Sequence, residues 1–196
     1  MRAYRQERRR ETAAETRRRL VVATAALHNE QGIAATSLKQ IADRAGVSIG
    51  AAYHHFPTYE AAIAACGAHN FASHPLPHPS IFRGVESLEQ RLLLLARALF
   101  DVYRAIPGLA SAYHERKGFA VLDRDLARLD RGIETLLRAA LAPQVLDEAA
   151  RPAALALLSD SFYRRLADAG LAPEQAASEA AALIAARLSL RSDKDT

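Results

Sequence analysis

Apolar residues recur at steps of three and four along almost the whole of this 196-residue chain. Such spacing places side chains on one face of an α-helix, whereas a strand would alternate apolar and polar residues and favour β-branched side chains. No segment of the sequence shows that alternation. The chain is therefore predicted to be all-α, and its clearest helical run is Leu88, Leu92, Leu95, Leu99, Val102 and Ile106.

The composition narrows the class of protein further. Apolar residues make up 50% of the chain, which is enough for a sizeable core. Cys66 is the single cysteine, so a disulfide within the chain and a zinc site built from several cysteines are excluded. No apolar run approaches the roughly 20 residues that span a membrane, and no apolar segment follows the charged start MRAYRQERRR. We expect a cytoplasmic protein with no membrane association.

Arginine is concentrated at the N-terminus. The formal net charge of the whole chain is only +4, yet residues 1–19 hold eight arginines against Glu7, Glu11 and Glu15. This concentration is typical of a segment that binds a polyanion, and it is also found in solvated chain ends. Residues 1–15 are interpreted as a basic N-terminal arm, and the rest of the chain has to decide between these two roles.

Four helices are predicted in the N-terminal part of the chain. Most are bounded by residues that cap or stop helices, with a serine or threonine before the helix and a glycine or proline after it. The proline-rich stretch HPLPHPS, residues 74–80, is then expected to be a linker. The predicted helices cover about residues 12–31, 38–45, 48–55 and 58–73.

The segment GVSIG, residues 46–50, also fits the G-x-S-x-G pattern, in which a serine nucleophile follows a β-strand in one large enzyme family. That arrangement requires a strand ending at Gly46, and the preceding SLKQIADRA has helical spacing instead. An esterase is therefore disfavoured, and no catalytic residue is predicted. Ser48 is expected to cap the helix that follows it.

A short helix, a glycine turn and a second short helix form the plan of a helix-turn-helix, whose second helix enters the major groove of DNA. In that second helix, Ala52 and Phe56 are four residues apart and are expected to pack inward. Residues on the opposite face would then face DNA, joined by those at the helix N-terminus, where backbone N–H groups favour phosphate. These residues are Ser48, Ile49, Gly50, Ala51, Tyr53 and His54.

Residues 35–56, ATSLKQIADRAGVSIGAAYHHF, resemble the DNA-binding segment of the TetR family of transcriptional regulators. The usual form of that segment is T-S-x-x-x-I-A-x-x-A-G-V-S-x-G-x-x-Y-x-H-F, and with the upstream helix the resemblance covers about residues 16–63. It implies an N-terminal three-helix helix-turn-helix DNA-binding domain. The matching positions are Thr36, Ser37, Ile41, Ala42, Ala45, Gly46, Val47, Ser48, Gly50, Tyr53, His55 and Phe56. Further DNA contacts are expected at Arg17, Thr36, Ser37, Lys39, His55 and Tyr59.

Three features depart from the usual pattern of the family. His28 stands where an aromatic side chain usually belongs to the small core, and it is expected at the core or its edge. Tyr59 stands where many members have a lysine that touches phosphate; it can still donate a hydroxyl but brings no charge. The small residues at 50–52 give the recognition helix no hydrogen-bonding side chain there. Base readout is therefore expected to depend on Tyr53, His54 and apolar contacts with thymine methyls.

Residues 81–191 are expected to form a second helical module for effector binding and dimerisation, followed by a tail at 192–196. Residues 151–169 are predicted as one helix closed by Gly170, and the last helix starts near Pro173. In the TetR family the two C-terminal helices of each subunit usually form a four-helix interface with a second subunit. The expected dimer contacts are Leu155, Leu158, Phe162, Leu166, Ala180, Leu183, Ile184 and Leu188.

The resemblance also implies a small-molecule effector that binds in the C-terminal bundle and changes the spacing of the two recognition helices. Aromatic residues beside the main apolar stripes are the candidates, and each of them can equally fill the core. No cofactor and no metal site is predicted, because His69, His74 and His78 have no acidic partner in this loose spacing. The candidate effector contacts are Phe100, Tyr103, Tyr113, His114, Phe119 and Phe162.

Together these patterns favour a dimeric TetR-type regulator that binds an inverted-repeat operator in double-stranded DNA. Most members of that family are repressors, and the effector would release the protein from the operator. One recognition helix reads only a few base pairs, so two half-sites and a two-fold dimer are expected. The alternative is a helical interaction module whose basic arm binds an acidic partner.

Overall fold

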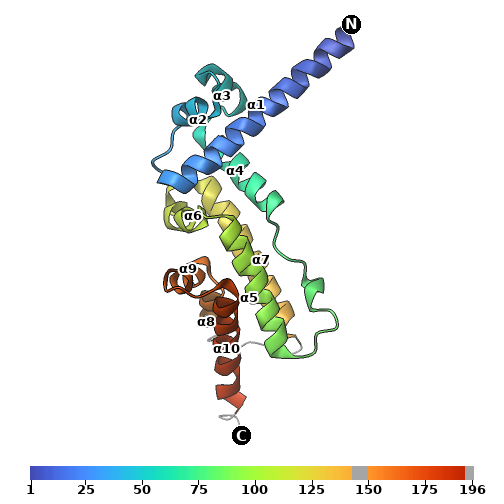
Figure 1. Ribbon diagram of the computed structural model, residues 1–196, viewed down its shortest axis with the longest axis vertical. Helices are drawn as coiled ribbons and strands as arrows, with labels where there is room; N and C mark the ends of the chain where they lie inside the picture. Colours follow the sequence, from blue (N-terminus) through green and yellow to red (C-terminus); the bar gives the residue numbers. More distant parts are fainter. Residues whose placement is uncertain (143–149, 193–196) are drawn as a thin grey trace. The chain divides into compact units, whose positions relative to one another are not determined.

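The computed structural model describes residues 1–142 and 150–192, and every regular element in those ranges is helical (Figure 1). This confirms the all-α prediction. Within the same ranges, no helix is long and apolar enough to cross a membrane. The elements are α1 (Arg2–Gln31), α2 (Leu38–Ala45), α3 (Ile49–His55), α4 (Tyr59–Ser73), η1 (Pro79–Phe82), α5 (Leu88–Ala105), α6 (Leu109–Glu115), η2 (Arg116–Gly118), α7 (Ala120–Leu141), α8 (Arg151–Leu157), α9 (Asp160–Asp168) and α10 (Pro173–Ser192).

The chain divides into two compact units, each built from two stretches of sequence. The first unit holds Met1–Ser73 together with Ala110–Leu126, and the second holds His74–Leu109 together with the chain from Ala127 onward. The sequence analysis placed all of residues 81–191 in one module. The structure instead assigns most of α6, all of η2 and the start of α7 to the unit that contains the helix-turn-helix.

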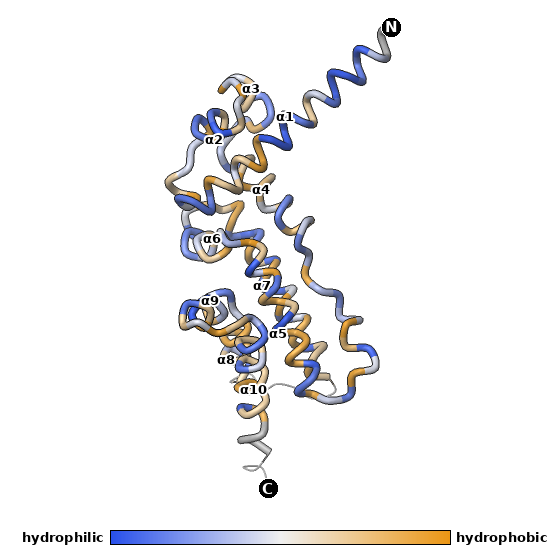
Figure 2. Tube along the Cα trace, in the orientation of Figure 1, coloured by the Kyte–Doolittle hydropathy of each residue, from blue (hydrophilic) through white to orange (hydrophobic). Residues whose placement is uncertain are grey.

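The core of the first unit is built on a stripe along α1 against which α2 and α4 pack, and α3 packs in turn on α2. Figure 2 shows the change along α1 from a hydrophilic N-terminal half to a C-terminal half with apolar residues. The helix therefore begins about ten residues earlier than the apolar spacing predicted, because its N-terminal half carries no apolar stripe by which to recognise it. The buried core residues are Leu20, Val21, Ala23, Leu27, Leu38, Ile41, Ala42, Ala45, Ala52, Phe56 and Ala62.

Local hydrogen bonds fix the angle between α2 and α3. Ser37 and Gln40 form a capping box at the start of α2, as their spacing predicted. Gly46 ends α2 with φ 64°, a left-handed conformation that glycine adopts without strain. The guanidinium of Arg19 donates to the carbonyl oxygens of Ala45 and Gly46, which ties the turn to α1.

Glu115, at the end of α6, binds the loop between α1 and α2. Its carboxylate accepts hydrogen bonds from the backbone N–H groups of Ile33 and Ala34 and from the hydroxyl of Ser111. Gly32 makes this approach possible, because a Cβ there would lie 2.8 Å from Oε1 of Glu115. This carboxylate explains why residues 110–126 belong to the first unit.

The second unit is organised around α5, which packs against α10 and α9. Arg91 of α5 donates to the carbonyl oxygens of Ala139 and Ala142, and so satisfies the C-terminal end of α7. The linker packs in this unit as well, since the side chain of Leu76 lies 2.6 Å from the position that a Cβ on Gly132 would take.

The prediction of one helix over residues 151–169 was wrong, because the structure has two. The helix α8 ends at Leu157 and α9 begins at Asp160. Ser159 causes the break: its hydroxyl accepts from the N–H of Phe162 and donates to the carbonyl of Ala156. A serine that caps a new helix thus outweighs the continuous apolar spacing.

His28 lies in the core of the first unit, which confirms its expected place. Its side chain is 6% exposed, and its Nε2 lies 2.9 Å from the hydroxyl oxygen of Tyr59. The Tyr59 hydroxyl donates to the carbonyl of Ile33, so the histidine Nε2–H donates to the tyrosine oxygen. Burial lowers the pKa of His28 from 6.5 to about 4, against a smaller opposing effect of Glu115.

This histidine predicts a pH-dependent free energy of unfolding. Between pH 6.5 and about 4, His28 is protonated in the unfolded chain and neutral in the folded one. The unfolded state therefore binds more protons, and stability falls as the pH falls through that window. At about 1.4 kcal/mol per pKa unit, the loss is on the order of 3 kcal/mol by pH 4. Urea unfolding at a series of pH values measures it.

The matched variants are His28→Phe, which keeps an aromatic ring of similar size, and His114→Gln, which changes an exposed histidine. The first is expected to lose most of this pH dependence and the second to keep it. An unchanged pH dependence in His28→Phe would show that other groups cause it.

Candidate nucleic-acid interface

The helix α3 has one buried face and one exposed face. Ala52 and Phe56 are 0% and 1% exposed, as their spacing predicted. On the other side, Tyr53 is 53% and Ile49 42% exposed, which is unusual for large side chains with apolar surface. This face presents groups that can hydrogen-bond to base edges or touch thymine methyls. Its exposed members are Ser48, Ile49, Gly50, Tyr53 and His54, with Ala51 and His55 half-exposed.

The N-terminus of α3 is capped by Ser48, whose hydroxyl accepts from the N–H of Ala51 at 3.2 Å. This is the role predicted for it. Gly50, in the first turn, lies against open space, because a Cβ there would have only the Ser48 hydroxyl nearby, at 4.0 Å. The absence of a side chain at position 50 is therefore not required for packing within the unit.

Cationic side chains lie on the helices next to α3 in the sequence and the fold. The guanidinium of Arg17 lies 5.0 Å from the centre of the Phe56 ring, so α1 places a positive charge beside the end of α3. Lys39 is exposed on α2 and pairs with Asp43 at 2.8 Å. Such an exposed pair contributes at most about 1 kcal/mol, so a phosphate can replace Asp43 as the partner of Lys39.

The two histidines at the end of α3 are in contact, with ring centres 5.4 Å apart. Partial burial lowers the pKa of His55, and the nearby charges of His54 and Arg17 lower it further. The lowered pKa disfavours the positively charged form of His55.

Two of the expected DNA contacts have structural roles instead. Thr36 is buried, and its hydroxyl donates to the carbonyl of Gly32 and accepts from Gln31. The hydroxyl of Tyr59 is occupied by His28 and Ile33, as described above. Both hydroxyls therefore stabilise the loop before α2, and neither is free for phosphate.

The candidate effector residues fall into different units. Phe100 and Tyr103, both of α5, are 1% exposed and pack together in the second unit with ring centres 6.1 Å apart. The residue that completes this cluster is Tyr163, 5.0 Å from Phe100, and the sequence analysis missed it in favour of the neighbouring Phe162. The break at Ser159 changed the phase of the helix, so Tyr163 points inward and Phe162 is half-exposed.

The other three candidates belong to the first unit. Phe119 packs edge-on against Tyr59 with ring centres 6.0 Å apart, and His114 is exposed. The ring of Tyr113 lies 5.7 Å below the guanidinium of Arg116. Phe119 thus supports the helix-turn-helix unit, a role that sequence spacing did not indicate.

Asp160 is a buried carboxylate beside the aromatic cluster of the second unit. It is 4% exposed; its Oδ2 accepts from Arg164 at 2.9 Å, and its Oδ1 has no hydrogen-bond partner among the described residues. Arg164 also donates to the carbonyls of Tyr103 and Ile106, which links Asp160 to α5. Burial raises the pKa of Asp160, while Arg164 opposes that rise. A buried acceptor without a donor is costly, so this oxygen is suited to a donor from a ligand.

Three of the residues expected at the dimer interface are buried within the single chain. Leu158, Ala180 and Ile184 are 0 to 1% exposed, and the α10 stripe that contains the last two packs in the α5 unit. They are therefore core residues, because the apolar spacing of α10 marks the side that faces its own unit. Of the remaining expected contacts, Leu183 is 45% exposed, and Leu155, Phe162, Leu166 and Leu188 are partly exposed.

Comparison with known proteins supports this description of the fold. Residues 20–66 match the family model of bacterial regulatory proteins, tetR family. No curated protein sequence matches the chain. These 47 residues include the helix-turn-helix and the start of α4.

Solved structures with similar folds cover most of the chain. A tetR-family transcriptional regulator from Streptomyces coelicolor is 18% identical with a TM-score of 0.68, covering 90% of this chain and 82% of that one. The TetR-family regulator PfmR from Thermus thermophilus is 20% identical with a TM-score of 0.64, covering 84% and 96%. The multidrug binding protein EbrR complexed with imidazole is 22% identical with a TM-score of 0.60, covering 86% and 93%. The chain therefore has the fold of the TetR-family transcriptional regulators, and its residues 20–66 carry the DNA-binding helix-turn-helix domain of that family.

Proposed function

We propose that this protein is a dimeric transcriptional repressor that binds an inverted-repeat operator and is released from it by a small-molecule effector. The observation that carries the proposal is the outer face of α3, which exposes Tyr53, His54 and Ile49 beside a cap and a turn of the family's type. About half of the Tyr53 and Ile49 side chains stays open to solvent in the part of the chain that the structure describes. A major groove offers them partners.

Dimerisation follows from the small size of the recognition surface. A helix of seven residues reads only a few base pairs, and a two-fold dimer places two such helices on half-sites about 34 to 36 Å apart. The partly exposed apolar side chains of α8, α9 and α10 support a partner surface there, with Leu183 as its most exposed large member. The repressor role and the cytoplasmic location follow the general pattern of the family.

A substitution series separates base readout from phosphate binding. The probe is the duplex that wild-type protein selects from a random library, compared with an unrelated duplex of the same length. Tyr53→Ala is expected to lower the affinity for the selected duplex by about tenfold to 100-fold. Its affinity for the unrelated duplex should stay nearly unchanged. Arg17→Ala should weaken both duplexes alike and reduce the slope of log affinity against log salt by about 1.

Fluorescence anisotropy at several salt concentrations gives both quantities. Equal loss of discrimination in the two variants would contradict the assigned roles. If the wild type selects no duplex at about 100 mM salt, the interaction module with an acidic partner becomes the better explanation.

Gly50 tests the contact between the α3 backbone and DNA. Gly50→Ala is expected to raise the free energy of unfolding by up to about 1 kcal/mol, because alanine favours the helix and the site is open. The same methyl group should weaken binding to the selected duplex by roughly tenfold if the backbone approaches DNA closely.

The matched control is Gly67→Ala on α4, where a Cβ would make an ordinary contact at 3.8 Å from Asp125. It should gain similar stability without any change in DNA affinity. Undiminished DNA binding by Gly50→Ala would remove the close approach from the proposed interface.

The effector is proposed to bind in the second unit beside Asp160 and the cluster of Phe100, Tyr103 and Tyr163. The unsatisfied carboxylate oxygen and the aromatic rings favour a planar ligand that carries N–H donors or a positive charge. EbrR, which shares the fold at 23% identity, has been solved with proflavin, a cation of this kind.

Proflavin is therefore the probe for this site. Saturable binding measured by its fluorescence is expected for the wild type, and Asp160→Asn should weaken it by about tenfold, since a charge-assisted hydrogen bond is lost. The control is Asp101→Asn, which removes an exposed carboxylate of α5 paired with Arg104. Equal proflavin affinity in the three proteins would argue against Asp160 as a ligand group.

A further inference from the structure

The N-terminal arm is a continuation of α1 rather than a separate segment. Arg5 and Arg9 follow the same helical stripe as Thr16, Leu20 and Leu27, because they are separated by steps of three and four or their multiples. From Leu20 onward this stripe is buried against the helix-turn-helix. Before Thr16 the arm is exposed. The side of α1 that packs in the core at Leu20 and Leu27 therefore carries Arg5 and Arg9 in the arm.

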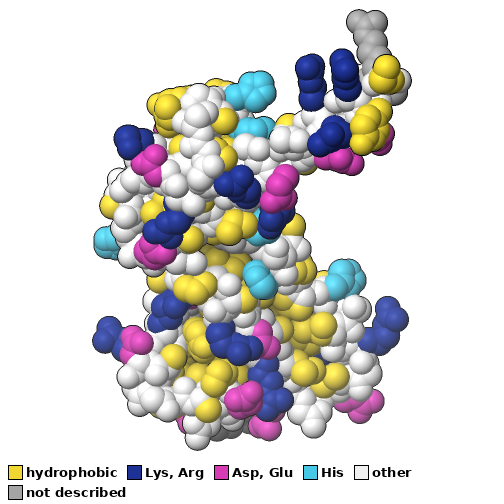
Figure 3. Space-filling view, turned by 45° about the horizontal axis from the view of Figure 1, so that its top comes forward, with side chains coloured by type: hydrophobic (Ala, Val, Ile, Leu, Met, Phe, Trp, Pro, Cys, Tyr) yellow, Lys and Arg dark blue, Asp and Glu magenta, His cyan; other side chains and the backbone are white. Residues whose placement is uncertain are grey.

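The acidic residues of the arm lie on the opposite stripe. Glu7, Glu11 and Glu15 are spaced four apart, and the stripe continues through Arg18 to Val22, which is 47% exposed. Arg18 is paired with Glu15 at 2.7 Å. In Figure 3 the arm lies at the upper right: dark blue side chains rise from its upper side, and its lower side carries magenta side chains with a dark blue one beside them.

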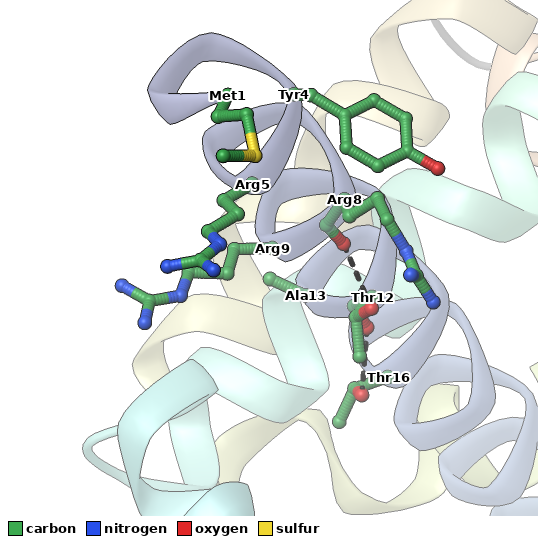
Figure 4. A pocket seen from close by; sticks show the side chains of 8 residues that line it. All are labelled: Met1, Tyr4, Arg5, Arg8, Arg9, Thr12, Ala13 and Thr16. Carbon is green, nitrogen blue, oxygen red and sulfur yellow. Dashed lines mark hydrogen bonds between the residues drawn. The ribbon is translucent and has the colours of Figure 1, made fainter.

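The arginines on the first stripe are free to bind a partner. Within the described residues, Arg5 and Arg9 have no ion pair, nor has Arg8 beside this stripe, and the nearby hydroxyls of Thr12 and Thr16 donate to backbone carbonyls of α1 at 2.8 Å. Figure 4 shows these side chains around a shallow open hollow on the arm, with Arg5 and Arg9 on one side of the helix and Arg8 and Tyr4 on the other.

The position of the helix-turn-helix sets the direction of this face. Arg19 of α1 holds the turn before α3, and Arg17 lies over Phe56 at the end of α3, so α3 is seated over the stripe between them. The arginine face of the arm is therefore directed to the side on which α3 lies. The 14 residues from Arg2 to Glu15 extend it by about 20 Å, at 1.5 Å per residue.

We infer that α1 binds the phosphates of the DNA that flanks each half-site, through the face that carries Arg5 and Arg9. An arm of about 20 Å spans roughly six base pairs at 3.4 Å per step. The inference rests on the proposed DNA binding and adds to it a second contact region with a defined face. Because Glu7 and Glu11 lie opposite Arg5 and Arg9, with Arg8 and Arg10 between the two faces, the arm attracts a polyanion most strongly on the Arg5 and Arg9 side.

The test uses the full-length protein and two duplexes. One is the inverted-repeat site that the wild type selects from a random library, trimmed to its two half-sites, and the other is the same site extended by about eight base pairs at each end. The wild type is expected to bind the longer duplex more tightly. Arg5→Gln with Arg9→Gln should abolish that gain, and should reduce the salt slope on the longer duplex by about 2 for each subunit.

Arg18→Gln is the matched control, because it removes one arginine from the same helix on the acidic side. Arg18→Gln should still bind the longer duplex more tightly than the trimmed one. The single variant Arg9→Gln should lose a large part of this difference in affinity. Equal effects of Arg9→Gln and Arg18→Gln would indicate a flexible arm without a defined face and would overturn the inference.

Two further outcomes separate this inference from the proposed function. If the wild type binds both duplexes equally well, the protein binds DNA but the arm does not, and the inference fails alone. If the wild type selects no duplex at all, the proposed function fails and the inference fails with it.

The double variant of Arg5 and Arg9 gives one more contradicting result. A loss of affinity that is equal on both duplexes would place these arginines within the half-site and contradict flanking contacts.

Discussion

The apolar stripe of α1 is the interaction on which the DNA-binding unit depends. Leu20, Ala23 and Leu27 are almost fully buried on it, and α2 and α4 both pack along it. A helix of only seven residues such as α3 cannot hold a fixed direction by itself, because short helices are marginal in water. Packing on α2, which is itself held on the stripe, supplies that direction, and the helical phase of α1 decides which side of the N-terminal arm carries Arg5 and Arg9.

A single carboxylate extends this unit to a distant part of the sequence. Glu115 binds two N–H groups in the loop before α2, and Gly32 leaves room for it. These hydrogen bonds cross more than 80 residues of chain, so they tie α6 to the loop from which the helix-turn-helix begins. The contact between Tyr59 and Phe119 is a second connection of the same kind within this unit.

Much of the fold could be predicted from local patterns. The capping box of α2, the glycine turn and the inward pair Ala52 and Phe56 were all correctly placed, since each depends on residues within one helical turn. The predictions failed where a non-local contact or a competing cap decided the outcome. Ser159 split a helix that apolar spacing made continuous, and this exchanged Phe162 for Tyr163 in the aromatic cluster.

The candidate sites divide in the same way. Spacing alone identified the exposed face of α3, but it could not show that the hydroxyls of Thr36 and Tyr59 are already hydrogen-bonded inside the unit. It also could not separate the apolar side of α10 that packs in its own unit from a side left for a partner. Both distinctions need the positions of groups far apart in the chain.

The sequence by itself determined the helical class and the helix-turn-helix, whereas the extension of α1 through residues 2–11, which gives its arginines a helical phase, came from the structure. The helical class and the helix-turn-helix each arise from interactions within a few residues, and such interactions are written directly in the order of amino acids. Only the tertiary structure decided that Glu115 joins the helix-turn-helix unit, that His28 is hydrogen-bonded to Tyr59, and that Asp160 has an oxygen without a partner among the described residues. Burial and hydrogen-bond satisfaction depend on which distant segments meet, and local sequence does not specify that meeting.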